Sequence, residues 1–121
     1  MKVAYLSITG NVTQFIKKLN LSKDDIIEIG ENINPEPIND EFILIAPTYE
    51  EDMTFPLNDF LDENHSYCKG IIGSGNRNFG DDGYCFTAKD LSKEYNIPVI
   101  YDFEYAGLDS DVLKVKDLID K

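Results

Sequence analysis

Residues 70–80 are the part of the sequence densest in groups that can bind a small ligand. A short apolar run there gives way to Ser74, Gly75 and Asn76, and the stretch continues through an arginine and an asparagine to Phe79. Glycine lets a ligand approach backbone N–H groups closely, and asparagine offers both a donor and an acceptor. Because ligands of open parallel sheets collect at the carboxyl ends of strands, the pattern predicts a binding loop behind a buried strand. A turn without a ligand is the alternative.

Residues 7–13 form a second candidate site, because polar side chains there separate an expected strand from an expected helix. A helix that begins here would direct N–H groups outward at the positive end of its dipole, beside the hydroxyls of Ser7 and Thr9. Such a terminus favours an anion, most simply a phosphate. No lysine lies in this turn, so it differs from the phosphate loop of nucleoside triphosphate hydrolases. Ordinary capping of the helix by Thr9 or Asn11 is the alternative.

Residues 47–55 form the third candidate, because they follow the clearest buried strand of the chain. The segment carries Thr48, Tyr49 and three consecutive acidic residues, 50–52, and we expect all of it to be a loop. Tyr49 and Phe79 could cover a flat ring, although each could equally be a surface hydrophobe without a role.

The elements that must position these loops are visible as apolar patterns. Continuous apolar runs predict strands at residues 2–6, 25–29, 42–46, from Gly70 onward, and at 99–103. Helical spacing predicts helices that begin near Val12 and Pro56, a third marked by Ala88, and a last one capped by Asp109 or Ser110. A loop with two prolines is expected at residues 34–39. Strands that alternate with helices predict an α/β fold with a doubly wound parallel sheet, and five strands fit the order 2-1-3-4-5. In that order the three candidate loops converge on one crevice, which favours a phosphorylated, planar ligand.

Composition bounds the function classes. A chain of 121 residues is expected to form one domain, and its net charge of -12 argues against nucleic acid and against an anionic membrane surface as partners. No apolar stretch is long enough to span a bilayer and no signal sequence is apparent, so we expect a cytoplasmic protein. Cys68 and Cys85 lack the spacing of a redox or zinc motif, and with the single histidine His65 they predict no metal site.

Several motifs carry a resemblance to a known family. Residues 7–11 resemble the phosphate loop of flavodoxins, and residues 74–80 are similar to the S-G-N-R-N-[FW]-G signature of the NrdI flavodoxins. Residues 84–85 stand where that family often has an aromatic residue followed by cysteine, and residues 103–107 match its F-E-x-x-G element. Residues 50–52 depart from the family, because many relatives have a glycine-containing turn there.

The resemblance covers nearly the whole chain and implies a flavodoxin-like FMN-binding domain over residues 1–121. It further implies a redox activator, rather than an enzyme with its own metabolite substrate, that works with the small subunit of class Ib ribonucleotide reductase. Members take electrons from a flavin-reducing donor and use dioxygen to supply the oxidant that assembles the dimanganese-tyrosyl radical cofactor of that subunit. The residues expected to bind FMN are Ser7, Thr9, Gly10, Asn11, Val12, Thr48, Tyr49, Glu50, Ser74, Gly75, Asn76, Asn78, Phe79 and Gly80.

Three other functions compete with this interpretation. A general electron-transfer flavodoxin would share the cofactor but not the partner. A response-regulator receiver domain shares the topology, but Ser7 and Pro47 occupy the strand ends where it needs acidic residues. A ligand-free interaction module would leave the three polar loops without a purpose.

Overall fold

The computed structural model describes residues 1–30, 38–80 and 83–120, apart from the side chain of Phe79. Its centre is a parallel sheet of five strands in the order β2-β1-β3-β4-β5. The strands are β1 (Lys2–Leu6), β2 (Ile26–Ile29), β3 (Phe42–Ala46), β4 (Cys68–Gly75) and β5 (Val99–Glu104). The predicted strand order is therefore confirmed.

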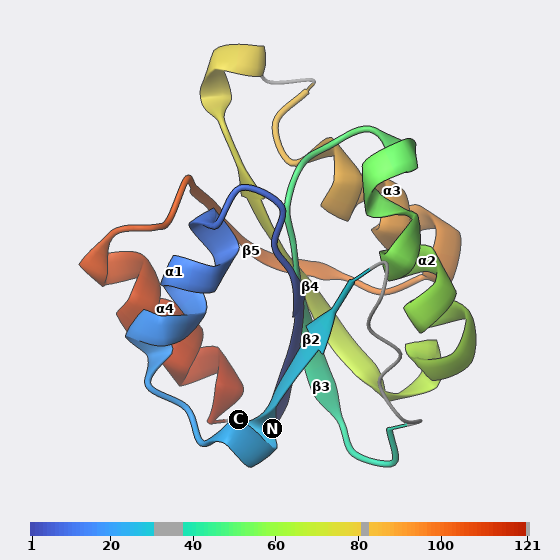
Figure 1. Ribbon diagram of the computed structural model, residues 1–121, viewed down its shortest axis with the longest axis vertical. Helices are drawn as coiled ribbons and strands as arrows, with labels where there is room; N and C mark the ends of the chain where they lie inside the picture. The colour runs from blue at the N-terminus through green and yellow to red at the C-terminus, as the bar shows by residue number, and fades with distance from the viewer. Residues whose placement is uncertain (31–37, 81–82, 121) are drawn as a thin grey trace.

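Four helices cover the sheet: α1 (Asn11–Leu19), α2 (Glu51–Asn64), α3 (Phe86–Tyr95) and α4 (Asp109–Ile119). Figure 1 shows α1 and α4 on one face and α2 and α3 on the other, which is the doubly wound arrangement. Short 3-10 turns precede β2 and β4 and follow β4, at Lys23–Asp25, His65–Tyr67 and Arg77–Phe79. Within the described residues, no helix is long and apolar enough to cross a membrane.

The central strands divide their side chains between two cores. On β1 and β3, Val3, Tyr5 and Ile43 pack toward α1 and α4, while Ala4 and Leu44 pack toward α2 and α3. Because helices cover both faces, these strands are continuous apolar runs rather than alternating ones. The helices supply the matching apolar faces, and the four α1 residues with helical spacing are all buried: Val12, Phe15, Ile16 and Leu19.

The predicted start of α2 is wrong. The helix begins at Glu51, and Glu50 is its N-cap, whose carbonyl accepts hydrogen bonds from the N–H groups of Met53 and Thr54. Acidic residues in a first turn suit the positive end of the helix dipole, and the burial of Leu57 and Leu61 adds to this against the backbone hydrogen bond that Pro56 removes from the helix interior. The loop after β3 is consequently short and ends at Glu50.

Other boundaries differ in smaller ways. Strand β4 begins at Cys68, before the expected Gly70, and β5 extends beyond residue 103 to Glu104. Helix α4 is capped neither by Asp109 nor by Ser110, because the Asp111 carboxylate accepts the N–H of the N-cap residue Leu108 at 2.8 Å. The proline-containing loop expected at residues 34–39 lies mostly outside the described residues.

Candidate functional site

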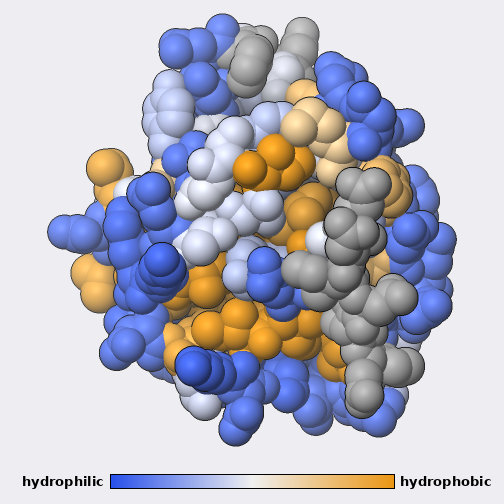
Figure 2. Space-filling view, in the orientation of Figure 1, coloured by the Kyte–Doolittle hydropathy of each residue, from blue (hydrophilic) through white to orange (hydrophobic). Residues whose placement is uncertain are grey.

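A cavity of about 640 Å³ opens at the carboxyl ends of β1, β3 and β4. This volume lies within the range of about 300 to 1,000 Å³ that is typical of small-molecule sites. The cavity is lined by Ser7, Ile8, Thr9, Asn11, Val12, Pro47, Thr48, Tyr49, Glu50, Met53, Ser74, Gly75, Asn76, Gly83, Phe86 and Tyr105. Figure 2 shows weakly polar residues and a small hydrophobic group at the upper centre of the molecule, above the strand ends, with strongly hydrophilic residues on the flanks.

The β1–α1 loop brings the start of α1 to this cavity. Gly10 is the N-cap residue and has φ +94°, a conformation that residues with a Cβ rarely adopt. The side-chain acceptor in the first turn of α1 is Ser7, so the alternative of capping by Thr9 or Asn11 is wrong. The Ser7 hydroxyl accepts the Thr13 N–H at 3.2 Å, while the N–H groups of Asn11 and Val12 occupy first-turn positions that have no acceptor within a helix.

Three helices begin beside the cavity, because Phe86 at the start of α3 also lines it, and the first turns of α1 and α2 differ in charge. The first turn of α1 contains no acidic residue, whereas α2 begins with Glu50 as N-cap followed by Glu51 and Asp52. These carboxylates compensate the positive end of the α2 dipole, whereas no acidic side chain compensates the positive end of the α1 dipole. An anion in this cavity is therefore favoured at α1 and disfavoured at α2.

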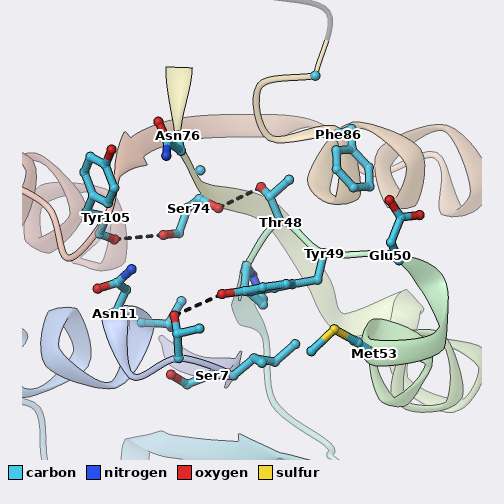
Figure 3. A pocket seen from close by; sticks show the side chains of 16 residues that line it. Ser7, Asn11, Thr48, Tyr49, Glu50, Met53, Ser74, Asn76, Phe86 and Tyr105 are labelled. Carbon is cyan, nitrogen blue, oxygen red and sulfur yellow. Dashed lines mark hydrogen bonds between the residues drawn. The ribbon is translucent and has the colours of Figure 1, made fainter. Parts of the chain in front are cut away.

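The β3–α2 loop crosses the cavity from the other side. The Thr48 hydroxyl donates a hydrogen bond of 2.8 Å to the Ser74 carbonyl. The Tyr49 hydroxyl donates one of 3.0 Å to the Thr9 hydroxyl, so the ring bridges two loops (Figure 3). An aromatic face and an anion-favouring helix terminus thus lie in one cavity.

Sequence reasoning missed Tyr105, which closes a further side of the cavity. Its carbonyl accepts the Ser74 hydroxyl at 2.9 Å and its N–H donates to the Gly75 carbonyl at 3.0 Å, so the loop after β5 is fixed to the end of β4 (Figure 3). Tyr105 has φ +53° and a half-exposed side chain. Its position directly after the fifth strand was a usable signal, because β5 ends at the same edge of the sheet as β4. The other unpredicted lining residues are Ile8, Pro47, Met53, Gly83 and Phe86.

Two glycines of β4, Gly73 and Gly75, leave space for the side chain of Cys85. A Cβ on Gly73 would lie 2.8 Å from the Cβ of Cys85, and one on Gly75 would lie 2.9 Å from its Sγ. Cys85 is 1% exposed, and burial, followed by the charge of Asp102, raises the pKa of its thiol to about 11. Both Cys85 and Cys68 are free and buried, which fits a packing role.

The segment directly after β4 is held to β5 by Arg77. Arg77 Nε lies 3.2 Å from Glu104 Oε1, its Nη2 lies 3.7 Å from Asp102 Oδ1, and its guanidinium carbon lies 4.1 Å from the centre of the Tyr84 ring. The Tyr84 hydroxyl donates to the same Asp102 oxygen at 3.0 Å. Arg77 therefore pairs with carboxylates of the protein and does not line the cavity.

The predicted site residues thus divide into two sets. Ten of them line the cavity: Ser7, Thr9, Asn11, Val12, Thr48, Tyr49, Glu50, Ser74, Gly75 and Asn76. Gly10, Asn78 and Gly80 do not line it, and the side chain of Phe79 lies outside the described residues. Asn78 is part of a turn in which its N–H donates to the Asn76 side chain at 2.9 Å. The described residues contain no cluster of three or more potential metal ligands.

The arrangement suits a phosphorylated aromatic ligand, because neutral hydroxyls and first-turn N–H groups lie at one end of the cavity and aromatic side chains border the rest. A family model described as "NrdI Flavodoxin like" matches residues 3–117 of the 121-residue chain. The match includes every loop around the cavity, and the strand order is that of flavodoxins. The chain therefore belongs to the NrdI flavodoxin-like family, which associates it with flavin binding and with the activation of ribonucleotide reductase.

Proposed function

We propose that residues 1–121 form a single FMN-binding domain and that FMN occupies the cavity at the strand ends. The observation that carries this proposal is the uncompensated start of α1, which lies in the same cavity as the Tyr49 ring. The phosphate would be held by the hydroxyls of Ser7 and Thr9 and by N–H groups of Gly10, Asn11 and Val12. No basic residue is present between residues 7 and 14, so the site relies on N–H groups, hydroxyls and the helix dipole.

The flat ring system would lie against the other loops. Tyr49 offers an aromatic face, and Thr48, Ser74 and Gly75 hold the surrounding backbone in place. Asn76 offers an amide at the cavity edge, which suits the carbonyl and N–H groups of a flavin. Glu50, Asn78, Phe79 and Gly80 complete the proposed set of FMN contacts.

We further propose that the protein activates class Ib ribonucleotide reductase. When bound, FMN would supply one or two electrons from a flavin-reducing donor to dioxygen, and the reduced-oxygen oxidant would serve assembly of the dimanganese-tyrosyl radical cofactor in the reductase small subunit. The role of this chain is to bind and orient FMN at a solvent-accessible edge. Family membership and the cavity support this function, and the proposed compartment is the cytoplasm.

The competing function is that of a general electron-transfer flavodoxin, which would use the same cavity. The two differ in their partner. Mixing the reduced FMN-loaded protein with manganese-loaded small subunit and dioxygen should produce tyrosyl radical, measured by electron paramagnetic resonance. Replacement by an unrelated flavodoxin is the control, and an equal radical yield from it would contradict a dedicated activator.

FMN binding itself can be tested by titration of the purified protein. We expect Thr9→Val to weaken FMN binding about tenfold, because a hydrogen bond to a charged group is worth about 1.5 to 3 kcal/mol. Thr13→Val is the matched control, since Thr13 does not line the cavity. If Thr9→Val and Gly10→Val together leave the FMN affinity unchanged, the phosphate does not bind at α1.

A further inference from the structure

The β3–α2 loop contains no glycine, and contacts to three other segments hold it in place. Thr48 is bonded to the Ser74 carbonyl on β4, and the Tyr49 hydroxyl is bonded to Thr9 before α1. The third contact comes from Thr87, in the first turn of α3.

The Thr87 contact is unusual because one hydroxyl serves both peptide groups of one residue. Thr87 Oγ1 accepts the Tyr49 N–H at 3.1 Å and donates to the Tyr49 carbonyl at 3.0 Å. Thr87 is 5% exposed, so its hydroxyl is poorly accessible to solvent. Its hydrogen-bonding capacity is directed at Tyr49 rather than at the cavity, which Thr87 does not line.

Fixing both peptide groups of a residue fixes the direction of its Cα–Cβ bond. For Tyr49 that direction sends the ring across the cavity, where its far end meets Thr9 (Figure 3). A tyrosine has two side-chain torsions, so a fixed backbone and a bonded hydroxyl leave the ring little freedom. The contact between an aromatic ring and a flat ligand depends on ring separation and offset, and small rotations reduce it.

We infer that Thr87 is a positioning residue for the proposed cofactor site: its hydroxyl orients Tyr49 so that the phenol ring can pack against the flavin. The inference rests on the proposed binding of FMN in this cavity. It assigns Thr87 no contact with FMN, and all of its effect passes through Tyr49.

The test compares FMN affinity, flavin fluorescence and flavin circular dichroism in the full-length protein and its variants. Thr87→Val keeps the shape of the side chain but removes the hydroxyl, and we expect FMN binding to weaken about tenfold as two hydrogen bonds are lost. The bound flavin should also become more fluorescent and lose circular dichroism intensity in the visible range. Thr87→Ser retains the hydroxyl and should restore all three properties.

The matched control is Tyr95→Phe, which removes another hydroxyl of α3, one whose hydrogen bonds run to Asn58 and Asp62 on α2 and whose residue does not line the cavity. It should leave the flavin spectra unchanged. A second comparison uses Tyr49→Leu, in which Thr87 has no ring to position. In that background Thr87→Val should cause no further change in fluorescence or circular dichroism, because the effects of residues that act through one another are not additive.

The outcomes separate the two proposals. Failure of the wild-type protein to bind FMN would contradict the proposed function. If the wild-type protein binds FMN but Thr87→Val leaves the affinity and the spectra unchanged, only the inference about Thr87 is overturned. The same holds if Thr87→Val has an equal effect with and without Tyr49. If Thr87→Val does not fold, hydrogen exchange of the Tyr49 amide in the wild-type protein decides: protection supports the Thr87 contact, and exchange at the unprotected rate refutes it.

Discussion

Gly73 in β4 lies against Cys85 at the start of α3, and adding a Cβ at Gly73 while removing the side chain of Cys85 should test why β4 has a glycine there. A Cβ on Gly73 would lie 2.8 Å from Cys85 Cβ, 2.9 Å from its Sγ and 3.1 Å from Ala88 Cβ. Unstrained carbon contacts lie at about 3.5 to 4.0 Å, so the added methyl would overlap buried neighbours by about 0.5 to 1 Å. We therefore expect Gly73→Ala to lower the free energy of unfolding by about 1 to 3 kcal/mol, as overpacking does in other cores.

Cys85→Gly removes the two nearest atoms of that overlap. Cys85 also has φ +55°, and the left-handed conformation costs a residue with a Cβ about 1 to 2 kcal/mol relative to glycine. That relief offsets the loss of a small buried side chain and the added entropy of a glycine in the unfolded chain, about 0.5 to 1 kcal/mol. The single variant Cys85→Gly should therefore change stability by only about 1 kcal/mol.

The double variant Gly73→Ala/Cys85→Gly should be more stable than the sum of the single effects predicts, by about 1 to 2 kcal/mol. Urea unfolding measures this coupling, because a slope of about 1 to 3 kcal/mol per molar makes a change of 1 kcal/mol visible as a shift in the midpoint. Additive effects would refute the argument that Gly73 exists to accommodate Cys85. A Gly73→Ala variant as stable as the wild-type protein would refute it as well.

Three further predictions concern charge and protonation. Burial raises the pKa of the Cys68 and Cys85 thiols from 9.0 to about 11, so the thiols of the unfolded chain lose their protons at lower pH than those of the folded protein. The free energy of unfolding should therefore fall as the pH rises from 9 to 11, and urea unfolding should show a shallower decline in a variant with both cysteines replaced by alanine. Arg77→Gln should lower the free energy of unfolding by about 1 kcal/mol, because it removes two ion pairs and a contact with the Tyr84 ring, and by less in 1 M salt, because the ion pairs are exposed. The control is Lys69→Gln, which removes a single exposed ion pair and should lower the free energy of unfolding by less. In the FMN-loaded protein, Glu50→Gln should raise the flavin reduction potential by about 20 to 80 mV, because one carboxylate at about 8 Å opposes an added negative charge by roughly 0.5 to 2 kcal/mol. Glu51 does not line the cavity, so an equal shift in Glu51→Gln would contradict a local effect of Glu50.

The local elements of the fold could be predicted because their signals lie within short stretches of sequence. Val12, Phe15, Ile16 and Leu19 recur with the period of a helix, and all four are buried. The strand runs could be recognised for a similar reason, since a strand covered on both faces needs apolar residues at every position. Alternation of these elements then limited the sheet to a parallel arrangement, and the order 2-1-3-4-5 is observed.

The start of α2 shows where local signals misled. Proline is common in the first turn of a helix, and on that basis Pro56 was expected to begin the helix. The helix instead starts at Glu51, with Pro56 in its interior, because the acidic first turn and the packing of Leu57 and Leu61 stabilise more than the lost hydrogen bond costs. This correction also moves two of the three acidic residues from a loop to a helix terminus, which leaves Glu50 as the acidic residue of that group at the cavity.

The sequence by itself determined the sheet, the loops that meet at its edge and the family, because each depends on a period or a motif of a few consecutive residues. Only the tertiary structure decided which groups within those loops serve the cavity. Thr87 and Tyr49 are 38 residues apart, and Thr9 and Tyr49 are 40 apart. Gly73 and Gly75 of β4 leave space for Cys85, the N-cap residue of the following helix. Contacts of this kind depend on how helices and strands pack, and that packing places side chains together without leaving a repeating pattern along the chain.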